Sequence, residues 1–172
     1  TGSGNYSLGQ PTLTNATISA RGLTVTADSL QTKVYGDSDP ASYTYSITSG
    51  SKVSGDSFSG ALARASGSDV GSYAITQNTL TLGNNYSITY VGANFTITPK
   101  ALTISGTTDN KVYDGATSAN LVTTSSSLVG VLSGEESLVT LVKTSASAAD
   151  YSSSNVGVYS VSVTGFTLSG TG

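Results

Sequence analysis

One short segment with a strand pattern occurs twice in this chain, and this repeat constrains the fold more than any other feature. Asn94-Phe-Thr-Ile-Thr-Pro-Lys-Ala-Leu-Thr-Ile104 aligns with Asn15-Ala-Thr-Ile-Ser-Ala-Arg-Gly-Leu-Thr-Val25. In the later copy only Pro99 and Lys100 separate two β-type runs, so one strand leads directly into the next. We therefore expect the last strand of one module to be followed at once by the first strand of another, in a tandem array.

The composition favours β-structure. Of the 172 residues, 37% are hydrophobic and only 10% are charged, while threonine, valine, isoleucine and tyrosine are frequent. Disordered chains combine high net charge with few β-branched and aromatic residues, which does not describe this sequence. The fold class predicted is all-β: small antiparallel modules in tandem, stacked end to end in a rod.

The first complete module is expected over residues 21–99. It opens with Leu23-Thr-Val-Thr26, in which Leu23 and Val25 share one face of a strand. Alternating patterns follow at Tyr43-Thr-Tyr-Ser-Ile47 and Tyr86-Ser-Ile-Thr-Tyr90, and no segment shows a sustained helical period. The module is therefore predicted to be antiparallel β throughout.

A second module is expected over residues 100–172, because two motifs recur there in the same order. Lys111-Val-Tyr113 repeats Lys33-Val-Tyr35, and Ser154-Asn-Val-Gly-Val-Tyr159 repeats Ser68-Asp-Val-Gly-Ser-Tyr73. The closing Asn-Tyr-Ser and Asn-Phe-Thr motifs of the first module have no counterpart after Phe166. The second module is thus predicted to lack its closing hairpin.

Residues 1–20 contain the motifs that the second module lacks. Asn5-Tyr-Ser-Leu8 matches Asn85-Tyr-Ser-Ile88, and Asn15-Ala-Thr-Ile18 matches Asn94-Phe-Thr-Ile97. We expect this segment to be the closing hairpin of a preceding module and to complete residues 101–172 of a neighbouring copy. The assembly residues are Tyr6, Leu8, Asn15, Thr17 and Ile18. The neighbour is either the next repeat of one polypeptide or a separate chain, and head-to-tail addition of this kind generates a filament.

Together these motifs resemble two families that alternate in bacterial surface proteins. Lys33-Val-Tyr-Gly-Asp-Ser-Asp-Pro40, with Val70-Gly-Ser-Tyr73 and Phe95-Thr-Ile-Thr-Pro-Lys100, resembles the MBG ("mostly beta, glycine-rich") module. Lys111-Val-Tyr-Asp-Gly115 with Val156-Gly-Val-Tyr159 resembles the companion YDG module. On this resemblance, residues 1–20 close a preceding YDG-like module, residues 21–99 are MBG-like, and residues 100–172 are YDG-like.

The resemblance implies a secreted or cell-surface protein, associated with the bacterial outer membrane and related to filamentous haemagglutinins. Such modules form the stalks of large adhesins, and neither family carries catalytic residues. The function expected is therefore a structural repeat unit of an adhesin stalk or filament, joined head to tail by strand complementation. The alternative is a module that binds glycan or a host protein.

Several other functions are disfavoured by the residues themselves. The net charge of -3 comes from ten acidic and seven basic residues without a basic cluster, so nucleic acid is not an expected partner. Histidine and cysteine are absent, which removes the usual general base and the thiol nucleophile. No apolar run approaches the roughly 20 residues of a membrane-spanning helix. We expect no enzyme activity, no cofactor and no membrane insertion.

Two pairs of residues are candidates for ligand contact. Tyr35 and Tyr113 recur after lysine and before a turn; aromatic faces stack on sugars, but a repeated tyrosine more often packs on its own module. Asp37 and Asp39 have the spacing to share a calcium ion, although the six to eight oxygens of a full site are not evident. The favoured interpretations are packing for the tyrosines and a turn for the aspartates.

Overall fold

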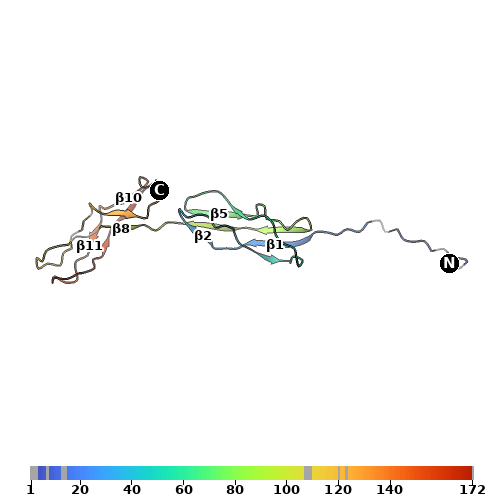
Figure 1. Cartoon of the computed structure of the whole chain (residues 1–172), viewed down its shortest axis with the longest axis horizontal. Helices are drawn as coiled ribbons and strands as arrows, with labels where there is room; N and C mark the ends of the chain where they lie inside the picture. Colours follow the sequence, from blue (N-terminus) through green and yellow to red (C-terminus); the bar gives the residue numbers. More distant parts are fainter. Residues whose placement is uncertain are drawn as a thin grey trace. The chain divides into compact units, whose positions relative to one another are not determined.

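The computed structural model describes residues 4–6, 8–12, 15–106, 110–119, 121–122 and 124–171, which form strands and no helix (Figure 1). The all-β prediction is confirmed. The chain divides into two compact units, Thr1–Lys33 with Asp37–Thr98, and Val34–Gly36 with Pro99–Gly172. The strands are β1 (Arg21–Ala27), β2 (Gln31–Val34), β3 (Tyr45–Ser49), β4 (Ala63–Arg64), β5 (Gly71–Thr76), β6 (Tyr86–Val91), β7 (Ala93–Thr98), β8 (Thr103–Ser105), β9 (Ser127–Val129), β10 (Val139–Val142), β11 (Ser147–Ala148), β12 (Val163–Thr164) and β13 (Thr167–Gly170).

Strands β1 to β7 form two sheets, ordered β3-β1-β6 and β2-β7-β5-β4. The pairs β1–β3, β4–β5 and β5–β7 are antiparallel. The pair β1–β6 is parallel, with a register that runs from Arg21 opposite Tyr86 to Thr26 opposite Val91. The prediction that this module is antiparallel throughout is therefore wrong for one pair. Local alternation predicts strands but does not determine which distant strands become neighbours, or in which direction.

The predicted closing hairpin of the first module is also wrong in its geometry. Only Gly92 separates β6 from β7, and the two strands belong to different sheets. A hairpin needs a loop of at least about two residues, so this single-residue link does not allow the strands to fold back and pair. Residues 86–98 instead pass from one sheet to the other as one extended run, which Figure 1 draws in yellow-green.

Alternating apolar residues of these two sheets build a sealed core. Leu23 and Val25 of β1 are buried, as their shared face predicts, and Phe95 and Ile97 of β7 are completely buried. Strand β7 lies between β2 and β5, so its side chains reach the centre of the unit. The buried hydrophobic residues are Leu23, Val25, Ala27, Leu62, Ile75, Leu80, Leu82, Phe95 and Ile97.

Strands β8 to β13 form three separate two-stranded sheets, β8-β9, β10-β13 and β11-β12. All three pairs are antiparallel. Among the described residues of 99–171 no hydrophobic side chain is fully buried, and the buried residue there is Ser126. Part of the core of this unit is therefore open.

The segment before β1 forms no strand in its described residues. Residues 4–6, 8–12 and 15–20 lie outside strands, and all are exposed. The hairpin predicted here is thus not observed in the described part of this segment. An isolated pair of strands is at best marginally stable in water, because it has no hydrophobic face to pack against.

Candidate functional site

The second unit contains a place that corresponds to the position of β7 in the first unit. Strand β7 is flanked by β2 and β5, whose counterparts by sequence are residues 109–112 and 157–162. Residues 110–112 and 157–162 are described, and none of them lies in a strand. We call the space between these two segments the second-unit slot; its lining includes Asn110, Lys111, Tyr113, Val156–Tyr159 and Val161. In the first unit the two segments that flank β7 are strands. The described residues of the corresponding segments in the second unit are not, and the sheets described there contain no counterpart of β7 between them.

Apolar side chains along this slot face solvent. Val112, Val156 and Val158 are exposed by 88%, 90% and 102%, whereas Val34, the counterpart of Val112 in β2, is exposed by 37%. A cavity of about 310 Å³ lies here and extends to Ala116 and Tyr151. Exposed apolar side chains gathered in one place are typical of a surface that binds a partner.

Three tyrosines give the slot an aromatic lining. Tyr113, Tyr151 and Tyr159 all border the cavity. The rings of Tyr151 and Tyr159 are tilted by 60° with centroids 6.2 Å apart, and the Lys111 Nζ lies 5.8 Å from the Tyr151 ring centroid. Such rings can pack against apolar side chains or against the faces of sugars.

Both units fold the same tyrosine back onto its own loop. The Tyr73 hydroxyl donates to the Asp69 carbonyl oxygen at 2.7 Å, and the Tyr159 hydroxyl donates to the Asn155 carbonyl oxygen at 3.0 Å. In each case the acceptor lies four residues earlier. This shared contact supports the alignment of residues 157–162 with β5, although only β5 is paired in a sheet.

Lysines next to the two Val-Tyr motifs bond to the turn that follows. The Lys111 Nζ contacts the Asp114 Oδ1 at 2.8 Å and donates to the Ala116 carbonyl oxygen at 2.9 Å. The hydrogen bond from Lys111 lowers the pKa of Asp114 below its ordinary value. In the first unit the Lys33 Nζ donates to the Asp37 carbonyl oxygen at 3.0 Å and contacts the Asp39 Oδ1 at 2.8 Å. Each lysine therefore stabilises the turn that follows it through a carbonyl oxygen and a carboxylate.

Asp39 is the centre of an ionic cluster in the first unit. The Arg64 Nε and Nη2 donate to Asp39 Oδ2 and Oδ1 at 2.8 and 3.0 Å, in addition to the contact with Lys33. The hydrogen bonds from Arg64, followed by that from Lys33, hold the pKa of Asp39 well below its usual range. Both carboxylate oxygens therefore contact cations where a calcium ion would have to bind, so the weak calcium hypothesis loses one of its two ligands.

Arg64 connects this ionic cluster to the hydrophobic core. Its guanidinium carbon lies 4.9 Å from the Tyr73 ring centroid and 5.4 Å from that of Phe95. Tyr43 contacts Phe95 edge to face and donates to Asp39 Oδ2 at 2.9 Å. Burial, followed by the Asp39 hydrogen bond, raises the pKa of Tyr43. The charged cluster thus packs against Phe95 of β7, which indicates a structural role.

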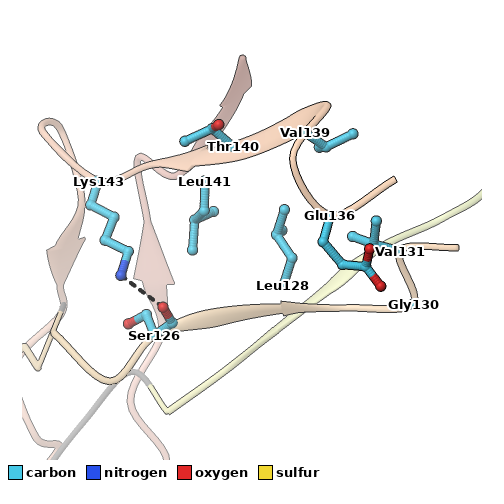
Figure 2. A pocket seen from close by; sticks show the side chains of 9 residues that line it. All are labelled: Ser126, Leu128, Gly130, Val131, Glu136, Val139, Thr140, Leu141 and Lys143. Carbon is cyan, nitrogen blue, oxygen red and sulfur yellow. Dashed lines mark hydrogen bonds between the residues drawn. The ribbon is translucent and has the colours of Figure 1, made fainter. Parts of the chain in front are cut away.

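A second hollow in the second unit exposes the inner side of its sheets (Figure 2). Leu128 of β9 and Leu141 of β10 point toward one another across a space of about 490 Å³, and Lys143 Nζ donates to the Ser126 carbonyl oxygen at 2.7 Å. These leucines are only half-buried. The hollow therefore has the character of an incompletely filled core.

The two candidate glycan-contact tyrosines differ in their surroundings. Tyr35 is half-buried, and its hydroxyl donates to the Glu135 Oε1 at 2.6 Å. Tyr113 is 64% exposed and lines the second-unit slot. Only Tyr113 therefore offers an open aromatic face.

The five residues predicted for assembly lie before β1 and are all exposed. Tyr6, Leu8 and Ile18 have exposures of 84%, 86% and 100%, and Asn15 and Thr17 are also exposed. Asp37 contributes its backbone oxygen to Lys33, and its side chain is exposed. All five assembly residues are therefore accessible to a partner.

Two residues that take part in these clusters, Arg64 beside Asp39 and Tyr151 beside Tyr159, were not identified from the sequence. Arg64 is the only charged residue between Asp56 and Asp69, and this isolation in a serine-, glycine- and alanine-rich stretch was a usable signal. Tyr151 belongs to no repeated motif, so nothing in the sequence placed it beside Tyr159.

Within the described residues, no helix is long and apolar enough to cross a membrane, and no three acidic side chains are grouped as metal ligands. Comparison with curated proteins and with solved structures gave no match. Comparison with protein families gave two: residues 23–96 match the MBG domain (YGX type), and residues 98–172 match the YDG domain. The chain therefore carries an MBG domain of the YGX type followed by a YDG domain.

Proposed function

We propose that this chain is a structural repeat unit of an extracellular bacterial adhesin stalk or filament, in which units join head to tail by strand complementation. The tandem MBG and YDG domains are consistent with a repeat-type module. On this proposal the protein acts at the bacterial surface and has no catalytic role. Its partners are copies of itself or neighbouring repeats, stacked end to end in a rod.

The observation that carries the proposal is the contrast between the two units. The first unit contains β7 between two strands and has a sealed core to which β7 contributes Phe95 and Ile97. In the second unit the described residues of the two corresponding segments, 110–112 and 157–162, lie outside strands, and no described hydrophobic residue of 99–171 is fully buried. A unit of this kind gains core and sheet contacts when a strand is added.

Sedimentation of the whole chain tests this proposal. We expect concentration-dependent, open-ended association, because a head-to-tail contact uses different surfaces on each copy and does not close. Deletion of residues 1–20 should abolish association while the MBG domain stays folded. A length-matched control replaces Tyr6, Leu8 and Ile18 with serine and should behave as the deletion does. Association that persists undiminished in both variants would refute the proposal.

A second function, glycan or host-protein binding, is favoured by the tyrosines of the second-unit slot. Tyr113 is exposed, and it borders the same cavity of about 310 Å³ as Tyr151 and Tyr159. Stacking of aromatic rings on sugar faces is the chemistry that this lining suits. Screening against a glycan array, with Tyr113→Ala as the test variant and Tyr35→Phe as the control, distinguishes the two functions. Binding lost only in Tyr113→Ala, with association unchanged, would support the alternative.

A further inference from the structure

We propose that residues Asn15–Ile18 of a second copy of this chain bind as a strand in the second-unit slot, antiparallel to residues 157–160, with Thr17 opposite Val158. This inference rests on the proposed function and specifies where the added strand binds. Its occupant is a second copy, because residues 15–18 of this sequence carry the pattern of β7.

The first unit shows what a slot of this kind holds. Strand β7 pairs with β5 so that Gly71 lies opposite Ile97, Ser72 opposite Thr96, and Tyr73 opposite Phe95. The second-unit counterparts of these three β5 residues are Gly157, Val158 and Tyr159, and the loop contact from Tyr159 to Asn155 reproduces that from Tyr73 to Asp69. The alignment is therefore supported by geometry as well as by sequence.

The arriving strand follows from the repeated segment at the start of the chain. Asn94 and Ile97 of β7 correspond to Asn15 and Ile18, and Thr96 corresponds to Thr17. Transferring the observed register places Ile18 opposite Gly157, Thr17 opposite Val158 and Ala16 opposite Tyr159. Ile18 would then take the place of the fully buried Ile97.

The preceding residues of the same segment have a second position in this arrangement. Tyr86 and Ile88 of β6 pair in parallel with Arg21 and Leu23 of β1. Their counterparts are Tyr6 and Leu8 on one copy, and Lys100 and Leu102 on the other. One extended segment would thus serve both sheets, as residues 86–98 do in the first unit.

Exposure of apolar groups on both partners supports this pairing. Ile18 is fully exposed, Tyr6 and Leu8 nearly so, and Val112, Val156 and Val158 face solvent along the slot. The described residues of 4–20 carry no charge, so none would be desolvated on binding. Burial of these side chains is favourable at about 25 cal/mol per Å² of apolar surface.

Ala16 corresponds to Phe95, which shows that the two slots are not filled identically. Phe95 packs against Tyr43 and Arg64 in the first unit. In the second-unit slot Tyr113, Tyr151 and Tyr159 already supply rings from the receiving side. A small residue on the incoming strand suits a slot with this aromatic lining.

Disulfide trapping tests the register directly, because the chain has no cysteine of its own. We expect Thr17→Cys on one chain and Val158→Cys on another, distinguished by tag size, to form a mixed disulfide dimer on oxidation. Directly opposite residues have Cα atoms about 4.5–5.5 Å apart, within the range for a disulfide. The control pairs Thr17→Cys with Val156→Cys, which is also exposed but lies two residues away from Val158 along the chain, and should give no dimer above background.

Two further experiments test whether the strand in the second-unit slot comes from a second copy, from the same chain or from a continuing polypeptide. A chain that carries both Thr17→Cys and Val158→Cys should form a ladder of oligomers; closure into an oxidised monomer would mean that the strand comes from the same chain and would overturn the inference. Appending residues 3–20 after Gly172 should protect amides 157–162 from hydrogen exchange, and the same protection should appear on mixing separate copies. Protection in the fusion alone would assign the slot to a continuing polypeptide and would overturn binding by a second copy.

The trapping experiment also separates this inference from the proposed function. If association requires residues 1–20 but the pair at 17 and 158 does not cross-link, the site is wrong and head-to-tail assembly remains supported. If association does not occur at all, the proposed function fails together with the site.

Discussion

Truncation of Phe95 provides the strongest test of the view that β7 holds the MBG domain together. The ring is completely buried in the central strand of a sheet, with Tyr43 edge to face at 5.5 Å and the Arg64 guanidinium at 5.4 Å. Phe95→Ala removes this ring from the middle of the core. We expect the free energy of unfolding to fall by about 3–5 kcal/mol, the range for a buried aromatic side chain.

This loss is large relative to the whole domain. At roughly 0.05–0.15 kcal/mol per residue, a domain of this size is stable by about 4–11 kcal/mol. Phe95→Ala should therefore bring the MBG domain close to unfolding. Hydrogen exchange of the whole chain, read from peptides that cover β5 and β7, measures the effect separately from the YDG domain.

Phe58→Ala is the matched control, because it makes the same chemical change at a half-buried ring. Phe58 also has an edge-to-face partner, Tyr45, at 5.3 Å. Its truncation should cost clearly less than that of Phe95. Equal losses from the two variants, or a loss below about 1 kcal/mol for Phe95→Ala, would refute the central role of β7.

Three further predictions concern other contacts. The folded pKa of Asp39 is depressed, so this carboxylate stabilises the MBG domain at pH values above its unfolded pKa of about 4, and the contribution should be lost as the pH falls below that value. Acid denaturation of Asp39→Asn should lack this component. An acid denaturation profile identical to that of the unsubstituted chain would contradict the prediction. Tyr73→Phe and Tyr159→Phe each remove one exposed hydrogen bond and should each lower the free energy of unfolding in urea by no more than about 1 kcal/mol; a much larger loss in either would show another role. Gly60→Ala should destabilise by about 1–3 kcal/mol in thermal unfolding, since its φ is +74° and an added Cβ would meet the Thr79 carbonyl oxygen; Gly22→Ala, with open space around it, is the control, and equal effects would contradict the steric argument.

The sequence predicted local features of this fold well and long-range pairing poorly. Alternation placed Leu23 and Val25 on one buried face. The motif repeated at Tyr73 and Tyr159 aligned two tyrosines whose hydroxyls make the same loop contact in the structure. The parallel pairing of β1 with β6 was missed, because a strand pattern carries no information about which distant strand lies beside it. The crossing at Gly92 was mistaken for a hairpin, because the sequence patterns end at Tyr90 and resume at Asn94 and so leave three residues for a turn. In the structure the strands extend until only Gly92 separates them.

The sequence identified individual residues of the candidate site, but it did not show which segments lie beside one another there. The tail residues Tyr6, Leu8 and Ile18 were singled out by their match to β6 and β7. The slot proposed to receive them was identified from the strands that flank β7, and these could not be known before the sheet order. The clustering of Arg64 with Asp39 and Lys33 likewise joins residues up to 31 positions apart (64 minus 33), which no local pattern encodes.

The parallel pairing of β1 with β6 has a mechanical consequence for the MBG domain. Strand β1 begins at Arg21, and β6 continues through Gly92 into β7, which ends at Thr98. Tension applied between these two ends would pull β1 and β6 past each other along their common direction, and the six residue pairs between them would be loaded together in shear. Single-molecule stretching should show one high-force event for this domain, whereas sequential low-force peeling would contradict this geometry. A domain loaded in this way resists extension as a clamp, which is the property that the proposed stalk would need.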